Sequence, residues 1–113
     1  MKTADPFYKS KRWERLRAAA MKRDKYMCQQ SKRYGLIKQA EMVHHILPRE
    51  NFPELQWSLW NLISLTNKEH DKLHDRASGK LTDEGMKLVR RLAMDRGLDL
   101  LKIEARLENA HEC

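Results

Sequence analysis

Apolar residues recur at helical spacing near the start of the chain. Trp13, Leu16 and Ala20 are three or four residues apart, the period that places side chains on one face of an α-helix. Ser10 precedes this segment, and its hydroxyl can accept a hydrogen bond from a free backbone N–H of the first helical turn. The pattern therefore predicts an amphipathic helix over residues 11–25.

The middle of the chain has the pattern of two short strands. The first is predicted over residues 36–47, where Ala40 and Met42 alternate with Gln39 and Glu41. Pro48 ends it, because proline has no backbone N–H with which to continue a strand. A second strand is predicted over residues 61–66. The intervening loop, residues 48–60, contains three large aromatic residues, and we expect their rings to anchor it by burial: Phe52, Trp57 and Trp60.

A short helix is predicted after the second strand. Thr66 or Asn67 can cap a segment over residues 68–77, and Gly79 is placed to end it.

The remaining residues, about 80–110, show two further helical patterns. Thr82 can cap a helix that Gly97 ends, and its apolar face consists of Met86, Val89 and Ala93. Leu100, Ile103 and Leu107 then recur at helical spacing. We expect a helical hairpin that covers the core, with docking of a partner protein as the alternative.

The composition indicates a single soluble domain of 113 residues with a modest core. Charged residues make up 35% of the chain, and no apolar run approaches the ~20 residues that span a membrane. The first residues lack the apolar stretch of a secretory signal. Cys28 and Cys113 are too few for a disulfide framework, so a reducing cytoplasm is expected.

Positive charge is concentrated at the amino-terminal end. Residues 1–40 contain 12 Lys and Arg against 3 Asp and Glu, whereas residues 41–113 contain 11 against 13. Such a segment suits the DNA backbone, with RNA as an alternative polyanion. Five basic residues share an arc of the predicted helix and are candidate phosphate contacts: Lys11, Arg12, Arg15, Lys22 and Arg23. The alternative is an ordinary amphipathic helix with a hydrated basic face.

Four histidines have a spacing that favours a metal site. His70 and His74 are four residues apart on the predicted helix, so their imidazoles would lie one turn apart on one face and could share an ion. His44, on the first strand, could supply a third ligand. His45 would point to the opposite side of that strand. A neutral histidine can take a proton from water near pH 7, so this set predicts metal-assisted phosphodiester hydrolysis.

Other interpretations of these histidines stay open. The segment from His70 to His74 differs from the zinc-protease pattern H-E-x-x-H in having Asp71 where Glu is required, and a protease would leave His44 and His45 without a role. A closed structural zinc site that includes Cys28 would make the protein a DNA-binding module without catalytic activity. The histidines could also be grouped by chance.

The segments FYKSKRWERLR and VHH, with the later asparagine and histidines, resemble the HNH endonuclease family. The family's H-N-H residues fall on His45, Asn61 and His70. The amino-terminal segment is similar to the phage-type branch, whereas the pair His44-His45 with His70 and His74 is similar to the nuclease colicins. The resemblance covers Phe7 to about His74.

This resemblance implies an α+β fold built on a ββα-metal finger: two short antiparallel strands and a helix around one divalent ion. The basic helix would precede a core over about residues 7–78, and the helical hairpin would follow it. The resemblance also implies roles: His45 as general base, His44 and His70 as metal ligands, with His74 as the third ligand. Asn61 would pin the loop and orient His45 by hydrogen bonding.

The chain departs from the family in ways that affect its cofactors. Many members bind a structural zinc through two C-x-x-C pairs, which here have become Cys28 to Ser31 and Thr66 to Glu69. With three of four thiolates missing, we expect no structural zinc and a small, buried, apolar role for Cys28. His44, where phage-type members commonly have Asp, shifts metal preference from Mg²⁺ toward Mn²⁺, Ni²⁺ or Zn²⁺. Mn²⁺ or Mg²⁺ is expected for activity, and Zn²⁺ or Ni²⁺ as ions that also bind.

The expected protein is a cytoplasmic, bacterial or prophage-encoded nuclease. It would nick duplex DNA with low sequence preference, as a monomer or weak dimer without a membrane partner. By resemblance alone, phage terminase or other packaging proteins are expected partners.

Overall fold

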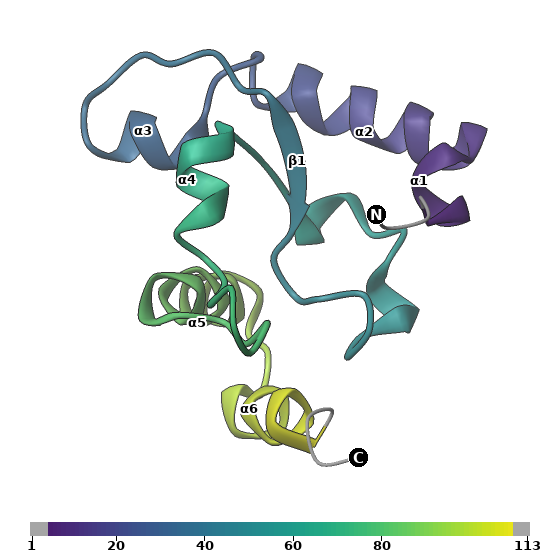
Figure 1. Cartoon of the computed structure of the whole chain (residues 1–113), viewed down its shortest axis with the longest axis vertical. Helices are drawn as coiled ribbons and strands as arrows, with labels where there is room; N and C mark the ends of the chain where they lie inside the picture. Colours follow the sequence, from purple (N-terminus) through teal and green to yellow (C-terminus); the bar gives the residue numbers. More distant parts are fainter. Residues whose placement is uncertain (1–4, 110–113) are drawn as a thin grey trace.

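Two short strands form an antiparallel sheet at the centre of the molecule (Figure 1). In the computed structural model, which describes residues 5–109, β1 (Met42–His45) pairs with β2 (Leu62–Leu65), and His44 lies opposite Ile63. The helices are α1 (Pro6–Lys9), α2 (Lys11–Arg23), α3 (Gln29–Arg33), α4 (Asn67–Asp71), α5 (Asp83–Arg96) and α6 (Leu100–Asn109). Two 3₁₀ turns, η1 (Pro53–Leu55) and η2 (Leu59–Asn61), precede β2.

Helix α2 packs on one face of the sheet. The Ser10 hydroxyl accepts a hydrogen bond from the Trp13 backbone N–H at 3.1 Å, as the sequence predicts, and α1 precedes it as an additional short turn. Trp13, Ala20 and Met21 are buried against Val43 and Leu62. The helix ends two residues earlier than expected, where Lys25 and Tyr26 adopt positive φ angles.

The first strand is much shorter than the predicted 36–47. Its partner β2 is only four residues long, so the ladder ends at Met42. Upstream, Gln39 forms only an isolated bridge with Met27, and Ile37 is 84% exposed. The second strand agrees with the prediction to within one residue at each end.

The predicted helix over 68–77 is wrong beyond Asp71, where α4 ends. The Thr82 hydroxyl donates to the Lys72 carbonyl, and the Thr82 backbone N–H donates to the Leu73 carbonyl at 2.9 Å. A continuing helix would need these carbonyls for its own N–H groups four residues later. Residues 72–82 instead form a hairpin, in which His74 bridges Leu81 and the chain turns at Gly79 with φ +75°.

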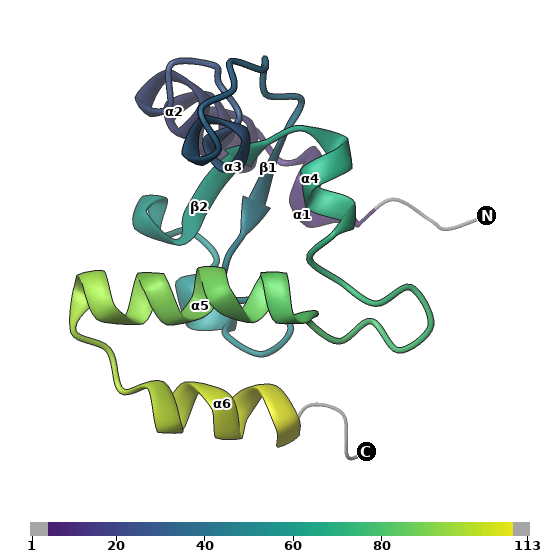
Figure 2. The same cartoon turned by 90° about the vertical axis from the view of Figure 1, so that its left-hand side faces the viewer.

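The carboxy-terminal helices cover the other face of the sheet, at the end of the molecule opposite α2 (Figure 2). Thr82 caps α5 and Gly97 ends it in a left-handed conformation, both as predicted. The apolar faces of α5 and α6 join strand β2 in one core cluster, which includes Val89, Ala93, Ile103, Ile63 and Leu65. The expected hairpin cover is therefore confirmed.

The aromatic loop before β2 is anchored unequally. Phe52 is 3% exposed, whereas Trp57 and Trp60 are only half-buried. Cys28 is fully buried, as expected, and caps α3 by accepting a hydrogen bond from Ser31 at 3.4 Å. Cys113 lies outside the described residues. No helix in the described part of the chain has the length and hydrophobicity to cross a membrane.

Candidate active site

The adjacent histidines of β1 face opposite sides of the strand. The His44 ring points toward α4 and the hairpin that follows it, and its centroid is 5.1 Å from that of His70 and 5.5 Å from that of His74. The His45 ring stacks instead on Trp13 of α2, at 5.2 Å and an interplanar angle of 23°. The alternation predicted for a strand therefore separates the two imidazoles.

Three imidazoles gather from three different elements. The rings of His70 and His74 are 5.8 Å apart, although His74 lies on the hairpin beyond α4. The helical spacing that suggested their proximity is thus not its cause. The hydrogen bonds of Thr82 close the hairpin and bring His74 back toward His44.

The spacing of these rings fits a single metal ion. A metal–nitrogen bond of ~2.0–2.1 Å puts each ring centroid about 3.2 Å from the ion, so tetrahedral ligands have centroids about 5.2 Å apart. The three observed spacings are 5.1, 5.5 and 5.8 Å. Even so, no three His, Cys, Asp or Glu side chains within residues 5–109 are already arranged to hold an ion. The three rings therefore lie close enough to share an ion, although as placed they do not form a ready binding group.

Burial favours the neutral form of these imidazoles, which is the form that can bind a metal ion or accept a proton. It lowers the pKa of His44 well below its ordinary value, and the neighbouring His70 and His74 reinforce the effect. It also lowers the pKa of His70, and that of His74, where Glu50 opposes the shift. Burial therefore favours, in all three rings, the uncharged form that can bind a metal.

A backbone carbonyl fixes the proton on His45. Its Nε2 lies 3.0 Å from the carbonyl oxygen of Gln56, which can only accept a hydrogen bond. The neutral ring must therefore carry its proton on Nε2, which leaves Nδ1 as the basic nitrogen. Burial lowers the pKa of His45 and nearby Arg49 lowers it further, whereas the hydrogen bond to Gln56 raises it.

Asn61 holds the loop that follows β1. Its fully buried amide accepts from the Leu47 backbone N–H at 2.8 Å and donates to the Leu47 carbonyl at 3.0 Å. This is the expected pinning of the loop, two residues beyond His45. The expected hydrogen bond to His45 is made by Gln56 instead.

The four histidines line an open cleft of about 610 Å³, whose other walls come from α1, α2 and the loop after β1. Two basic residues outside the predicted set also line it, Arg17 and Arg49. Arg17 could have been anticipated, because it lies four residues after Trp13 and so shares its helix face. Nothing in the sequence pattern marks Arg49 or Gln56, since both depend on how the loop after β1 folds.

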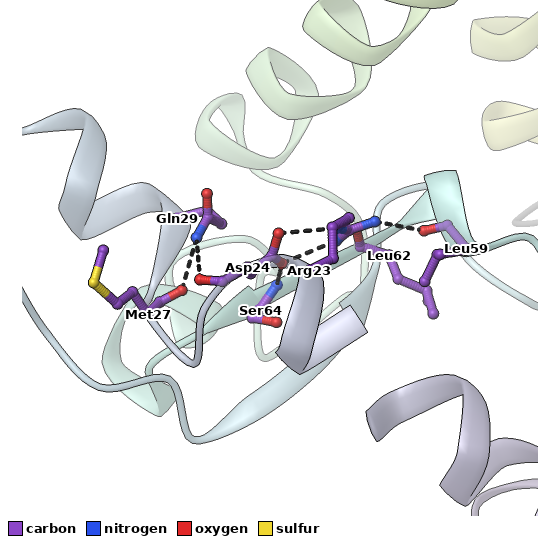
Figure 3. Close-up of polar contacts among 7 residues, drawn as sticks. All are labelled: Arg23, Asp24, Met27, Gln29, Leu59, Leu62 and Ser64. Atoms are coloured by element: carbon purple, nitrogen blue, oxygen red, sulfur yellow. Dashed lines mark hydrogen bonds and ion pairs between the residues drawn. The ribbon is translucent and has the colours of Figure 1, made fainter. Parts of the chain in front are cut away.

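One of the five predicted DNA-contact residues has a structural role. The Arg23 guanidinium donates to the carbonyls of Leu59 and Leu62 at 2.8 and 2.6 Å and pairs with Asp24 at 2.9 Å (Figure 3). The Asp24 carboxylate also accepts from the Ser64 N–H. Arg23 thus joins α2 to the start of β2, and its assignment to DNA binding stays a prediction.

The other four predicted contact residues are exposed on α2: Lys11, Arg12, Arg15 and Lys22. The Arg12 guanidinium lies 4.1 Å from the centroid of the Trp57 ring.

Comparison with known proteins decides the family. No protein-family model matches the chain. No curated protein matches it either. Among solved structures, the chain is similar to the HNH endonuclease of the deep-sea thermophilic bacteriophage GVE2, crystallised with manganese ion. The two are 35% identical with a TM-score of 0.57, over 58% of this chain and 72% of the phage enzyme. The chain belongs to the HNH endonuclease family.

As an HNH endonuclease, the protein is a metal-dependent nuclease that hydrolyses phosphodiester bonds, and its fold is of the ββα-metal type. The positions where many HNH members have cysteine pairs are linked here by weak polar contacts. The Cys28 sulfur accepts from the Ser31 N–H and lies 3.9 Å from the Thr66 hydroxyl. The absence of a structural zinc stays a prediction.

Proposed function

We propose that this HNH endonuclease nicks duplex DNA with low sequence preference, using one divalent ion and a histidine base. The observation that supports this proposal best is that the four imidazoles lie on two different sides of β1. His44, His70 and His74 are gathered on one side, and His45 stands apart with its Nε2 on the Gln56 carbonyl.

Each histidine has a separable role. His44, His70 and His74 would hold the ion, which supplies Lewis-acid stabilisation of the phosphate and the leaving oxygen. His45 would take the proton of the attacking water at Nδ1, the nitrogen left free by Gln56. Trp13 keeps the His45 ring from turning, and Asn61 holds the backbone beyond it. Asn61 is a positioning residue, since its buried amide cannot contact DNA.

Low sequence preference is proposed from the kind of basic groups available. Lys11, Arg12, Arg15 and Lys22 are exposed on α2, and Arg17 of the same helix lines the cleft. Contacts from such side chains to phosphates position the enzyme without reading bases. One site attacks one strand, so a double-strand break needs two cuts or two copies.

The metal and the biological setting are also proposals. The phage relative was crystallised with manganese, and we propose Mn²⁺ or Mg²⁺ as the activating ion here. Zn²⁺ or Ni²⁺ would also bind three imidazoles. A cytoplasmic location and a terminase or other packaging partner follow from the phage-type resemblance.

The decisive experiment uses supercoiled plasmid with Mn²⁺ or Mg²⁺, with and without chelator. Wild type should convert it to the open circle only when metal is present. His45→Ala should slow nicking by about 10²–10⁴-fold, the usual contribution of a general base.

Metal titration by calorimetry separates the roles of adjacent residues. His45→Ala should bind metal nearly as well as wild type, whereas His44→Ala should bind much more weakly. A folded, metal-loaded His45→Ala enzyme that nicks at the wild-type rate would remove the general base from this proposal. No nicking with any ion, together with unfolding by chelator, would favour the alternative of a non-catalytic DNA-binding module with structural zinc.

A further inference from the structure

Arg49 is held rigidly at the wall of the cleft. Its guanidinium carbon lies 3.8 Å from the centroid of the Phe7 ring, so α1 supports one face of the group. Its Nε donates to the Gln56 side-chain oxygen at 3.3 Å, and its Nη1 pairs with Asp5 Oδ2 at 2.7 Å. The side chain is 24% exposed, so the cation reaches solvent within the cleft.

Gln56 ties this cation to the candidate base. Its backbone carbonyl binds His45 Nε2, and its side chain binds Arg49. Phe7 makes a second connection, because its ring lies against Arg49 and is also 5.7 Å from the His45 ring, edge to face. The guanidinium and the His45 ring are therefore positioned by the same two residues.

The Asp5 carboxylate is the part of this arrangement that DNA could replace. Its two oxygens have different partners. Oδ1 accepts a hydrogen bond from the Phe7 N–H and caps α1, whereas Oδ2 accepts a hydrogen bond from the Arg49 guanidinium. Carboxylate and phosphate bind the planar fork of arginine in similar geometry. The Asp5 side chain is 46% exposed, so it can turn away from Arg49 without opening the core.

We propose that Arg49 binds a DNA phosphate beside the scissile bond, and that Asp5 occupies this subsite as a phosphate mimic in the DNA-free protein. The inference rests on the proposed function, since it assigns a substrate contact within the same cleft. Binding of DNA then exchanges one anionic partner of Arg49 for another. Asp5 acts as a built-in competitor that weakens binding to DNA.

The substitutions separate this exchange from general charge effects. Asp5→Asn removes the negative charge but preserves the helix cap, because asparagine caps as well as aspartate. Arg49→Gln removes the cation, and Arg49→Lys keeps the charge but not the fork. Asp95→Asn, at an exposed position of α5, changes the net charge by the same amount as Asp5→Asn and serves as the matched control.

The measurement is the affinity for a fluorescent duplex oligonucleotide, by anisotropy in chelator at several salt concentrations. Thermal melts establish that each variant is folded. We expect Asp5→Asn to bind about two- to fivefold more tightly, the range for release of one exposed ion pair. Arg49→Gln should bind more weakly, with a salt dependence reduced by about 0.9 in slope for the lost phosphate contact. Arg49→Lys should keep the slope and lose part of the affinity.

The double variant Asp5→Asn/Arg49→Gln is decisive. If Asp5 competes for Arg49, its removal gives no gain once Arg49 is absent, and the double variant binds like Arg49→Gln. An equal gain in both backgrounds, or an equal gain from Asp95→Asn, would reduce the effect to net charge and overturn the proposal. So would wild-type affinity in Arg49→Gln.

Because metal is absent from this assay, its result is independent of cleavage. Wild type that nicks plasmid while Arg49→Gln binds normally would leave the proposed function standing and remove the Arg49 subsite. If wild type binds DNA through Arg49 but never nicks, the Arg49 subsite stands and the proposed function is wrong.

Discussion

At the scale of single residues, the site depends on buried polar groups whose hydrogen bonds are satisfied. Asn61 and Ser64 are both fully buried, yet they differ in this respect. Asn61 bonds to both polar groups of the Leu47 backbone, whereas no hydrogen-bond partner is found for the Ser64 hydroxyl within the described residues. Loss of a buried polar group is costly only when it leaves its partners unpaired. The two residues should therefore respond differently to the same substitution.

Asn61→Ala should destabilise the protein by about 2–4 kcal/mol, since it leaves the buried N–H and C=O of Leu47 without partners. Nicking should fall with it, because the loop beyond His45 is released. Urea denaturation measures the first effect, and plasmid nicking well below the melting temperature measures the second. Ser64→Ala is the matched control and should be neutral or slightly stabilising. Equal losses in the two variants would contradict this account.

At the scale of elements, the short α4 and the hairpin after it determine where His74 lies. Gly85 of α5 makes this packing possible. A Cβ at this position would lie 2.5 Å from the Leu73 carbonyl oxygen and 2.9 Å from a methyl carbon of Leu81. Leu73 immediately precedes His74 in the chain, and Leu81 bridges it across the hairpin. The close approach of α5 therefore holds the third histidine in place.

Gly85→Ala tests this, because the sign of its effect on stability distinguishes helix propensity from a steric clash. Helix propensity alone would make alanine stabilising by roughly 1 kcal/mol. We expect net destabilisation of about 1–3 kcal/mol instead, because the backbone of Leu73 must move. Metal affinity, measured by calorimetry, should fall as His74 is displaced.

Asp95→Ala provides the control for propensity. This exposed position lies on the same helix α5, and alanine there should be slightly stabilising without altering metal binding. A Gly85→Ala variant that gains stability and keeps its metal affinity would show that α5 does not constrain the hairpin.

At the scale of the whole molecule, two clusters of apolar side chains hold the fold, and they are built without the three candidate metal ligands His44, His70 and His74. One cluster joins α2 to the sheet, and the other joins the sheet to α5 and α6. Arg106 of α6 pairs with Glu54, donates to the Asn51 carbonyl and lies 4.2 Å from the Phe52 ring centroid. The carboxy-terminal hairpin thus supports the loop that also supplies Gln56. Folding should therefore not require the metal.

Chelator should leave a folded protein with a cooperative thermal transition. Added Mn²⁺ or Zn²⁺ should raise the melting temperature in a saturable way, because an ion that binds only the folded state stabilises it by ~2.7 kcal/mol at one hundred times its dissociation constant. His44→Ala should lose most of this increase. Unfolding on chelation would instead indicate a structural metal that the two clusters cannot replace.

The sequence by itself determined the features that depend on near neighbours in the chain. Ser10, Thr82 and Gly97 begin or end their helices as predicted, since capping is a hydrogen bond or a backbone angle within one turn. Strand alternation likewise placed His44 and His45 on opposite sides of β1. These local patterns were sufficient to expect the separation of His44 from His45.

Tertiary structure alone decided the features that arise from residues distant in the chain. Thr82 binds the carbonyls of Lys72 and Leu73, just beyond the end of α4, so His74 reaches the site from a hairpin rather than a helix. Arg23 becomes a structural clamp because η2 and β2 present carbonyls to it, and Gln56 selects the basic nitrogen of His45 through its backbone. A local pattern cannot encode such contacts, because a backbone carbonyl is common to every residue and only folding places one beside a given side chain.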